Sequence, residues 1–350
     1  MTMFEIPALN PWGIVVVEPD PAAVKGAWQP AIGADAADCH KDTLRVRVSS
    51  ASPGATIRYT TDGREPTAAS TIYSGPIALA QSATVRARAF VDGVGESAAA
   101  SASFAKDDTV VAVLPDAAGL KADLRLWLRA DALAKTLADG ATVTTWSASA
   151  GPDADVRPVK LLSGIMAAPP TFVASAVNGQ PAVRFDGVDD SLAVADFANQ
   201  HLAGRAFAIF MVTQSADSEF GLCGNALGGS GGLPRLYLMR SAFFYDVLDK
   251  PVAVSADRGV AALTTFQHDG QSTASAWLNG LPKGTRSDLP VTKQFGGGHL
   301  AMPFWSGNQN RAGDIAELIV FGRALSESER AGVETYLADK YGLPCRARWR

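Results

Sequence analysis

Apolar and polar residues alternate with a period of two in short runs over the first third of the chain. The runs at 44–48, 56–60 and 84–90 place Val, Ile or Ala on one face and Arg or Thr on the other. This pattern is typical of half-buried antiparallel strands, and the Asp-Gly pairs at 62–63 and 92–93 are typical of the turns between them. It predicts a small β-sandwich over residues 41–106.

A second series of short runs continues to residue 345. The expected strands are 124–128, 142–146, 182–185, 207–212, 274–278 and 315–321. The pair Asn279-Gly280, directly after one of these runs, is a strong hairpin signal. Many short strands separated by Gly and Asp turns predict a two-sheet jelly roll over residues 121–345.

One helix is expected, at the end of this domain. Ser326 and Glu329 form a capping box, Val333 and Leu337 recur at helical spacing, and Gly342 ends the run. The predicted fold is therefore all-β: a small immunoglobulin-like sandwich followed by a two-sheet jelly-roll sandwich with one C-terminal helix.

Residues 1–40 are rich in Pro, Ala and Asp and contain Trp12 and Trp28. Two Trp side chains in a segment with little core of its own need a surface to bury against. Either the segment is an attachment arm that assembles with a neighbour, or it folds back on the next domain. Residues 107–120 are expected to be a linker, and 346–350 a basic tail.

The first domain carries a family resemblance in its motifs. GATIRYTTDGREPT, then the Tyr-x-Gly-Pro-Ile of 73–77 and TVRARAF, resemble the C-terminal immunoglobulin-like module of chitobiase and β-hexosaminidase over about residues 43–105. In that family the module is an accessory domain without catalytic residues. The resemblance implies a spacer or presenting role here.

The second domain resembles the laminin-G-like branch of the concanavalin A-like lectin/glucanase superfamily over about residues 120–344. The motifs that carry the resemblance are LRLWLRADAL, TTWSASAG, GQPAVRFDGVDDSL, AWLNG and DIAELIVFGRALSESERAGVETYLADKYGLP. The resemblance implies a jelly roll and raises the question of glucanase activity.

A retaining glycosidase needs two carboxyl groups about 5 to 5.5 Å apart. The nearest candidates are Asp314 and Glu317, which three residues apart on a regular strand would point to opposite faces. The four histidines, at positions 40, 201, 268 and 299, are far apart and give no metal-ligand or catalytic-triad spacing. The sequence therefore predicts a protein that is not an enzyme.

Asp186, Asp189 and Asp190 lie in a turn after an expected strand. They could ligate Ca²⁺ through their carboxylates, or the turn could be stabilised by Asx hydrogen bonds to backbone amides. Both interpretations stay open, and no other cofactor is expected.

The sequence PFWSGNQNR places Trp305 close to Asn308, Asn310 and Arg311. An aromatic ring beside such polar groups can stack on a sugar and hydrogen-bond its hydroxyls. Alternatively, Trp305 belongs to the core and the polar run is a connecting loop. Tyr237, in LPRLYLMRSAFFYD, can line either a surface or the interior.

Charge and hydropathy argue against nucleic acid and membrane as binding partners. The 31 Lys and Arg against 35 Asp and Glu form no basic cluster apart from the short tail, so no nucleic-acid partner is expected. The longest aliphatic run near the start, 14–17, is too short for a membrane span or a signal peptide. Cys39, Cys223 and Cys345 are odd in number and far apart, which leaves their redox state open.

These features lead to two functional hypotheses. The first is a non-catalytic virion component, a capsid decoration, tail or fibre protein of a phage, made in the host cytoplasm without a signal peptide. It would display a lectin-like jelly roll on the virion surface and join itself or other virion proteins through the N-terminal arm, with Trp12 and Trp28 in the contact. The alternative is a bacterial extracellular carbohydrate-binding or adhesion protein that binds a cell-surface glycan and lacks its leader.

Overall fold

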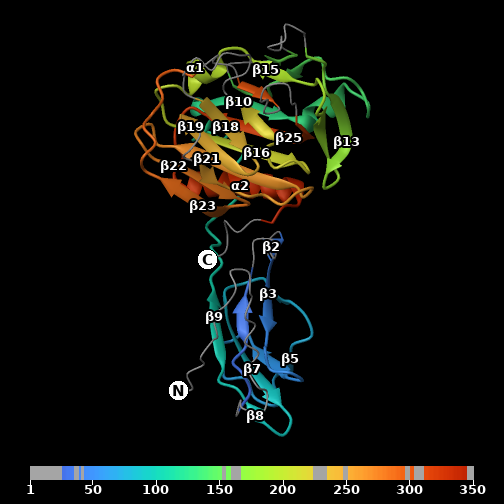
Figure 1. Cartoon of the computed structure of the whole chain (residues 1–350), viewed down its shortest axis with the longest axis vertical. Helices are drawn as coiled ribbons and strands as arrows, with labels where there is room; N and C mark the ends of the chain where they lie inside the picture. Colours follow the sequence, from blue (N-terminus) through green and yellow to red (C-terminus); the bar gives the residue numbers. More distant parts are fainter. Residues whose placement is uncertain are drawn as a thin grey trace, which may run out of the picture. The chain divides into compact units, whose positions relative to one another are not determined.

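A computed structural model describes residues 26–34, 39–40, 43–151, 155–158, 167–223, 235–246, 251–295, 300–302 and 311–344. The chain folds as two units, which are built around Val46–Phe104 and Ala105–Arg350. Both consist mainly of β-strands (Figure 1). The predicted all-β class is confirmed.

Two small sheets are built around the first unit, although residues 34–45, which include β2, are grouped with the second unit. One has the order β1-β3-β2 with β6 also paired to β3, and the other has the order β5-β4-β7-β8 with β9 also paired to β7. The strands are β1 (Ala31–Gly33), β2 (Cys39–His40), β3 (Thr43–Ser49), β4 (Thr56–Thr60), β5 (Thr71–Ile72), β6 (Ile77–Leu79), β7 (Ala83–Val91), β8 (Gly95–Glu96) and β9 (Ala100–Phe104). Alternate residues of β3 and β7 are buried, as the period-two pattern predicted.

Part of the expected N-terminal arm belongs to this sandwich. Ala31, Ile32 and Gly33 pair antiparallel with Ser49, Val48 and Arg47 of β3. The backbone N–H of Trp28 donates to Ser52 Oγ at 2.7 Å. The fold-back interpretation therefore applies to residues 31–33, because the edge of β3 offers them backbone hydrogen bonds. The Trp28 side chain is 39% exposed, and its role in assembly stays a prediction. Trp12 lies outside the described residues.

The second unit contains two larger sheets and the C-terminal helix (Figure 1). The larger sheet has the order β13-β14-β25-β16-β21-β22-β23, with β10 also paired to β25, and the smaller sheet has the order β15-β24-β17-β18-β19-β20. The strands are β10 (Leu124–Arg129), β11 (Trp146–Ser147), β12 (Asp155–Val156), β13 (Thr171–Val177), β14 (Gln180–Asp186), β15 (Leu192–Val194), β16 (Phe207–Gln214), β17 (Gly221–Cys223), β18 (Arg235–Met239), β19 (Ala242–Asp246), β20 (Val252–Ala253), β21 (Ala262–His268), β22 (Ala274–Leu278), β23 (Leu281–Arg286), β24 (Leu300–Met302) and β25 (Ala312–Phe321).

The central strands of the larger sheet, β25, β16 and β21, are buried on both faces. On β16, Phe207, Ile209 and Met211 belong to the core between the sheets. Ala208, Phe210 and Val212 belong to a second apolar layer on the opposite face, which also contains residues of the C-terminal helix. This explains why the strand reads as a continuous apolar run rather than as an alternation. We call the face of the larger sheet that carries this second layer its helix face.

The helix is α2 (Glu327–Tyr341), and it begins and ends as the sequence predicted. Ser326 and Glu329 form the reciprocal capping box, and Gly342 adopts the left-handed conformation at φ 60°. The predicted hairpin is also confirmed, because Asn279 and Gly280 connect β22 to β23 with φ values of 51° and 77°. The strand expected at 142–146 is reduced to Trp146, in β11. A second, short helix, α1 (Phe197–His201), was not expected.

The expected linker packs on the second unit over part of its length. The backbone N–H of Val113 donates to the carbonyl of Gly332 in α2 at 2.9 Å. Leu120 is buried in the apolar layer beneath the helix. We therefore call residues 107–120 the strap. Among the described residues, no helix is long and apolar enough to cross a membrane.

Candidate ligand-binding cleft

A polar cleft of about 740 Å³ lies where β14 and β16 end and β25 begins. We call it the end cleft. Four separate stretches of the chain line it: Arg184–Asp186, Gln214–Ser218, Arg258–Gly259 and Ala312–Asp314. Antiparallel pairing of β25 with β14 and β16 brings three of these stretches together. The N–H of Gly259, which donates to the carbonyl of Ser215, joins the fourth. The cleft thus gathers charged, amide and hydroxyl groups that are far apart in sequence.

An ion pair between Arg184 and Asp314, on the helix face, forms part of the lining of the end cleft. Arg184 donates from Nε and Nη2 to the two carboxylate oxygens of Asp314, both at 2.8 Å. The two residues are direct cross-strand neighbours on β14 and β25. The hydrogen bond to Asp314 raises the pKa of Arg184 above its ordinary value. This parallel two-bond geometry fixes the plane of the guanidinium at the cleft.

The turn after β16 is organised by its own polar side chains. Ser215 Oγ donates to the carbonyl of Ala312 at 2.6 Å and accepts from the backbone N–H of Asp217 at 2.9 Å. Asp217 in turn accepts from the backbone N–H of Glu219 at 2.8 Å. A side chain at Gly313 would place its Cβ 2.8 Å from Ser215 Cβ, so the two strand ends approach closely only because this residue is glycine.

Arg311, one of the predicted binding residues, lies beside this turn. Its guanidinium is paired with Asp217 at 3.3 Å and with Glu219. These contacts hold the start of β25 to the turn after β16. The structure therefore places Arg311 next to the end cleft, with its charge already matched by two carboxylates.

The predicted aspartate cluster also meets the end cleft, through Asp186. Ligand oxygens of Asp186, Asp189 and Asp190 all lie within 4.8 Å of one another. Asp186 Oδ1 accepts from the N–H of Val188 at 2.7 Å, and Asp190 Oδ2 accepts from the N–H of Asp186 at 2.9 Å. Burial raises the pKa of Asp190 to about 6, although the backbone bond opposes this shift.

The Asx-turn interpretation accounts for the bond from the N–H of Val188 to Asp186, two residues before it. Calcium needs six to eight oxygen ligands, and two of the cluster's oxygens already accept backbone N–H groups. A calcium site at Asp186, Asp189 and Asp190 stays a prediction.

The remaining predicted binding residues are not brought together in the described part of the chain. Trp305, Asn308 and Asn310 lie outside the described residues. Tyr237 is half-buried on β18, between Leu236 and Leu238, which point into the core. It therefore lies on the outer face of the smaller sheet. Cys39 and Cys223 lie in strands but their side chains are not described, and Cys345 lies outside the described residues.

The prediction that Asp314 and Glu317 point to opposite faces is wrong. A β-bulge in β25 shifts the register, so that Val212 pairs with Glu317 while Thr213 pairs with Ile315. The extra residue, Ala316, returns both carboxylates to the helix face. Regular spacing could not reveal this, because a bulge is set by pairing with β16.

Glu317 nevertheless lies away from the cleft, under α2. It is 1% exposed. Its carboxylate accepts from Trp127 Nε1 at 2.7 Å, Lys340 Nζ at 2.7 Å, and the hydroxyls of Tyr336 and Tyr341 at 3.0 and 2.9 Å. Burial raises the pKa of Tyr341, and the negative charge of Glu317 raises it further. Four donors and full burial make Glu317 a structural anchor for the helix.

A second concavity, of about 1080 Å³, lies between the strap, the β22–β23 hairpin and the start of α2. At one wall the guanidinium of Arg330 stacks 4.3 Å from the ring centre of Trp277 and pairs with the buried Glu334. Burial raises the pKa of Glu334, against the effect of Arg330. These groups are engaged with one another, so the wall is a packed structural element.

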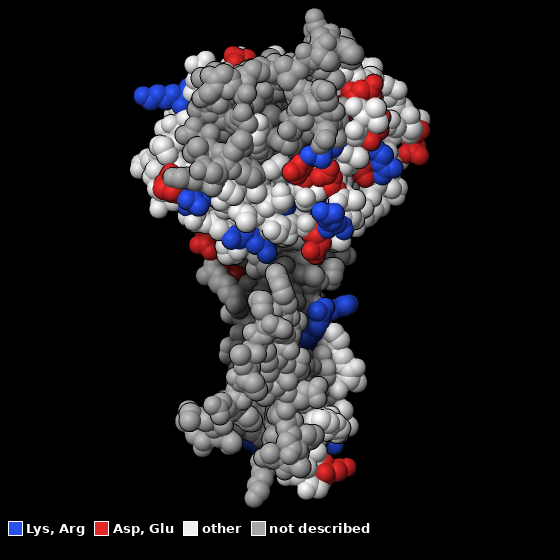
Figure 2. Space-filling view, viewed as in Figure 1, with Lys and Arg blue, Asp and Glu red and all other residues white. Residues whose placement is uncertain are grey.

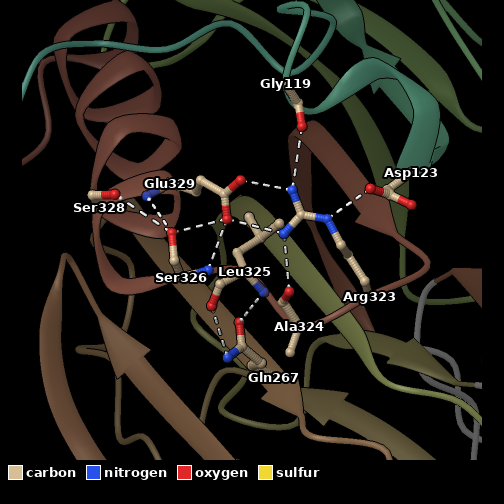
Figure 3. Close-up of polar contacts among 9 residues, drawn as sticks. All are labelled: Gly119, Asp123, Gln267, Arg323, Ala324, Leu325, Ser326, Ser328 and Glu329. Carbon is tan, nitrogen blue, oxygen red and sulfur yellow. Dashed lines mark hydrogen bonds and ion pairs between the residues drawn. The ribbon is translucent and has the colours of Figure 1, made fainter.

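Arg323 joins the strap to the start of α2 (Figure 3). It donates to Asp123 at 2.6 Å, to both oxygens of Glu329 at 2.9 and 2.7 Å, and to the carbonyls of Gly119 and Ala324. The hydrogen bond from Arg323 lowers the pKa of Glu329 to about 2. This network fixes where the strap meets the helix.

Sequence reasoning missed three arginines of the cleft region: Arg184, Arg258 and Arg240. Arg184 and Arg258 line the cleft, and Arg240 is buried behind it. The signal available for Arg184 was a charged residue in a strand pattern opposite Asp314. No local signal marked Arg240, because its partners come from distant segments.

On the face shown in Figure 2, basic and acidic side chains of the second unit are interspersed.

Several solved structures are similar to this chain. Domain 4 of AbnA, a GH43 extracellular arabinanase from Geobacillus stearothermophilus, has a TM-score of 0.45 and 12% identity, over 61% of this chain and 98% of that one. A GH54 α-L-arabinofuranosidase mutant has a TM-score of 0.45 and 10% identity, over 90% of this chain and 63% of that one. The binding domain of Paraclostridial Mosquitocidal Protein 1 has a TM-score of 0.41 and 11% identity, over 61% and 52%. This chain thus spans about half to two thirds of the last two, and the likenesses concern the fold alone.

No curated protein matches the sequence. A family model does match part of it: the chitobiase/β-hexosaminidase C-terminal domain, at residues 39–102. The laminin-G-like assignment of the second unit stays a prediction. For the first unit, the match confirms the family resemblance that its motifs predicted.

Proposed function

We propose that this is a non-catalytic glycan-binding protein, in which the second sandwich holds the sugar at the end cleft and the first presents it. The observation that carries the proposal is the convergence of Arg184, Gln214, Ser215 and Arg258 on one cleft from different strands and loops. A few fixed polar groups of this kind are what a binding site needs to orient a ligand rich in hydroxyls.

The state of the carboxylates on β25 and in the turn after β16 supports a binding role over catalysis. Both carboxylate oxygens of Asp314 accept hydrogen bonds from Arg184. The carboxylate of Asp217 forms an ion pair with Arg311. Glu317, the remaining candidate on β25, is buried and accepts four hydrogen bonds. A glycosidase needs one carboxyl group free to protonate the leaving group and a second free to attack or to activate water.

The segment that contains Trp305 completes the proposed site. It runs directly into Arg311, whose position is set by Asp217 and Glu219 at the cleft. In the proposal Trp305 supplies the stacking surface, and Asn308 and Asn310 supply amide groups for hydroxyls.

The proposed setting is the surface of a phage particle, with the surface of a bacterial cell as the alternative. The match of residues 39–102 to an accessory-module family supports a presenting role in either setting. Assembly through the N-terminus would involve residues before Trp28 together with the exposed Trp28 side chain, since residues 28 and 31–33 are bonded to the first sandwich through their backbone. Light scattering of the full chain and of a version beginning at residue 26 tests this: loss of an oligomer in the shorter chain supports assembly, and a monomer in both contradicts it.

The glycan proposal is tested by binding of the full chain to an array of neutral and acidic oligosaccharides. Trp305→Ala and Arg258→Gln should each reduce the signal at least tenfold. Arg64→Gln, on the exposed surface of the first unit, is the matched control and should bind as the unchanged chain does. If the unchanged chain binds no oligosaccharide, or if both cleft variants bind normally, the proposal is wrong.

A further inference from the structure

Arg240 is a buried cation at the meeting point of three chain segments behind the end cleft. It lies in the turn between β18 and β19 and is 1% exposed. Nη1 donates to the carbonyl and the hydroxyl of Thr213 at 2.8 and 3.1 Å. Nη2 donates to the carbonyls of Asp257 and Val260 at 2.6 and 2.7 Å. The side chain therefore bonds the end of β16 to the loop at 255–260.

The backbone of Arg240 reinforces the same junction. Its N–H donates to the carbonyl of Phe220 at 3.1 Å, and its carbonyl accepts from Ala256 at 2.9 Å. Within the loop, Ser255 and Gly259 have positive φ values of 58° and 72°. A residue other than glycine at positive φ persists only where its surroundings hold it. The bonds to Arg240 are such a constraint.

The shape of the guanidinium explains why an arginine occupies this buried position. Burying a cation is costly, and burial lowers the pKa of Arg240 to about 10, which leaves it charged at neutral pH. Its side chain donates to three carbonyls and a hydroxyl. A planar guanidinium carries five N–H donors in a rigid fork, so its two terminal nitrogens can serve acceptors on two sides, whereas a lysine ammonium has only three donors on one atom and an apolar side chain has none.

The loop that Arg240 holds is one wall of the end cleft. Arg258 and Gly259 line the cleft from the loop, and Ser215 and Asp217 line it from the turn after β16. The N–H of Gly259 donates to the carbonyl of Ser215 at 2.7 Å, which joins the two walls directly. Thr213, the side-chain partner of Arg240, lies two residues before Ser215.

We propose that Arg240 is the positioning residue of the end cleft: it sets the 255–260 loop against the end of β16, and so fixes Arg258 relative to the polar wall opposite. That the cleft binds a glycan rests on the proposed function above; that Arg240 orders the loop does not. Preorganised loops bind more tightly because less ordering is needed when the ligand arrives.

Hydrogen exchange of the full chain, followed by mass spectrometry, tests the ordering of the loop without any ligand. In Arg240→Lys and Arg240→Met, the amides of Ala256 and Gly259 should exchange at least tenfold faster, while amides of α2 keep their rates. Arg240→Lys retains a cation and should have the smaller effect. If Arg240→Met does not fold, the exchange rates of the loop amides in Arg240→Lys alone test the proposal. Loop exchange that is unchanged, or that rises only as much as in α2, overturns the proposal.

The oligosaccharide array then links loop order to binding. Arg240→Lys should lose at least fivefold in signal on the sugars that the unchanged chain retains. Full retention of binding despite a loosened loop would refute the positioning role. If the unchanged chain binds no sugar while the loop exchanges as expected, the glycan proposal fails and the ordering of the loop by Arg240 stands.

Discussion

Trp127 donates its indole N–H to the carboxylate of Glu317 at 2.7 Å, across 190 positions of sequence. The same carboxylate accepts from Lys340, Tyr336 and Tyr341 of helix α2. One buried acidic group therefore connects β10, β25 and the helix. An acceptor with two oxygens and a full charge can serve all of these donors at once.

Glu317→Gln should lower the free energy of unfolding by about 3 kcal/mol, because it leaves Lys340 with only the more exposed Asp131 as an ionic partner and replaces an acceptor oxygen by a donor. Urea unfolding of the full chain measures this. Glu327→Gln, on an exposed position of the same helix, is the matched control, and should cost about 0.5 kcal/mol through the helix dipole. Equal losses in the two variants would refute the anchoring role of Glu317.

Acid should weaken the junction between the strap and the helix. The pKa of Glu329 is about 2 in the folded chain against an ordinary value of 4.5. A carboxylate with a lowered pKa stabilises the fold fully above its unfolded value, and that contribution is lost as the pH falls from about 4.5 toward 2. The difference in thermal midpoint between the unchanged chain and Glu329→Gln should therefore shrink between pH 6 and pH 3. A difference independent of pH would contradict the ion pair with Arg323.

Asp190 should make the fold less stable at high pH, whereas Glu329 makes it less stable at low pH. Its pKa of about 6 lies above the ordinary 3.8, so its protonated form is favoured by folding and stability falls as the pH rises from about 4 to 6. Asp190→Asn should therefore raise the thermal midpoint more at pH 8 than at pH 4. If the cluster instead binds calcium, the unchanged chain at pH 8 will be stabilised by millimolar calcium chloride and Asp190→Asn will lose that effect.

Gly332→Ala tests the packing of the strap on α2. A Cβ at this position would lie 2.7 Å from Val113 Cγ2 and 3.2 Å from the carbonyl of Val111. An alanine within a helix would ordinarily stabilise it by about 1 kcal/mol, but here overpacking should make the variant less stable by about 1 to 2 kcal/mol. The double variant with Val113→Ala should recover part of the loss. Stabilisation by Gly332→Ala alone would show that the strap does not pack there.

The all-β class, the hairpin at Asn279-Gly280 and the limits of α2 could be predicted because each depends on neighbouring residues. Period-two alternation, a turn that requires positive φ and a capping box are all local. The resemblance of the first unit to an accessory-module family was equally local, since it rested on short motifs in order. These features follow from the chemistry of a few consecutive residues.

The cleft was decided by tertiary structure. The bulge at Ala316 that places Asp314 and Glu317 on one face depends on pairing with β16. The four acceptors of Arg240 come from residues 213, 257 and 260, and Arg184 meets Asp314 across 130 positions. A sequence read along its length shows which groups can form hydrogen bonds. Which of them are buried together depends on strand order, because buried polar groups find partners among whatever segments the sheets bring near.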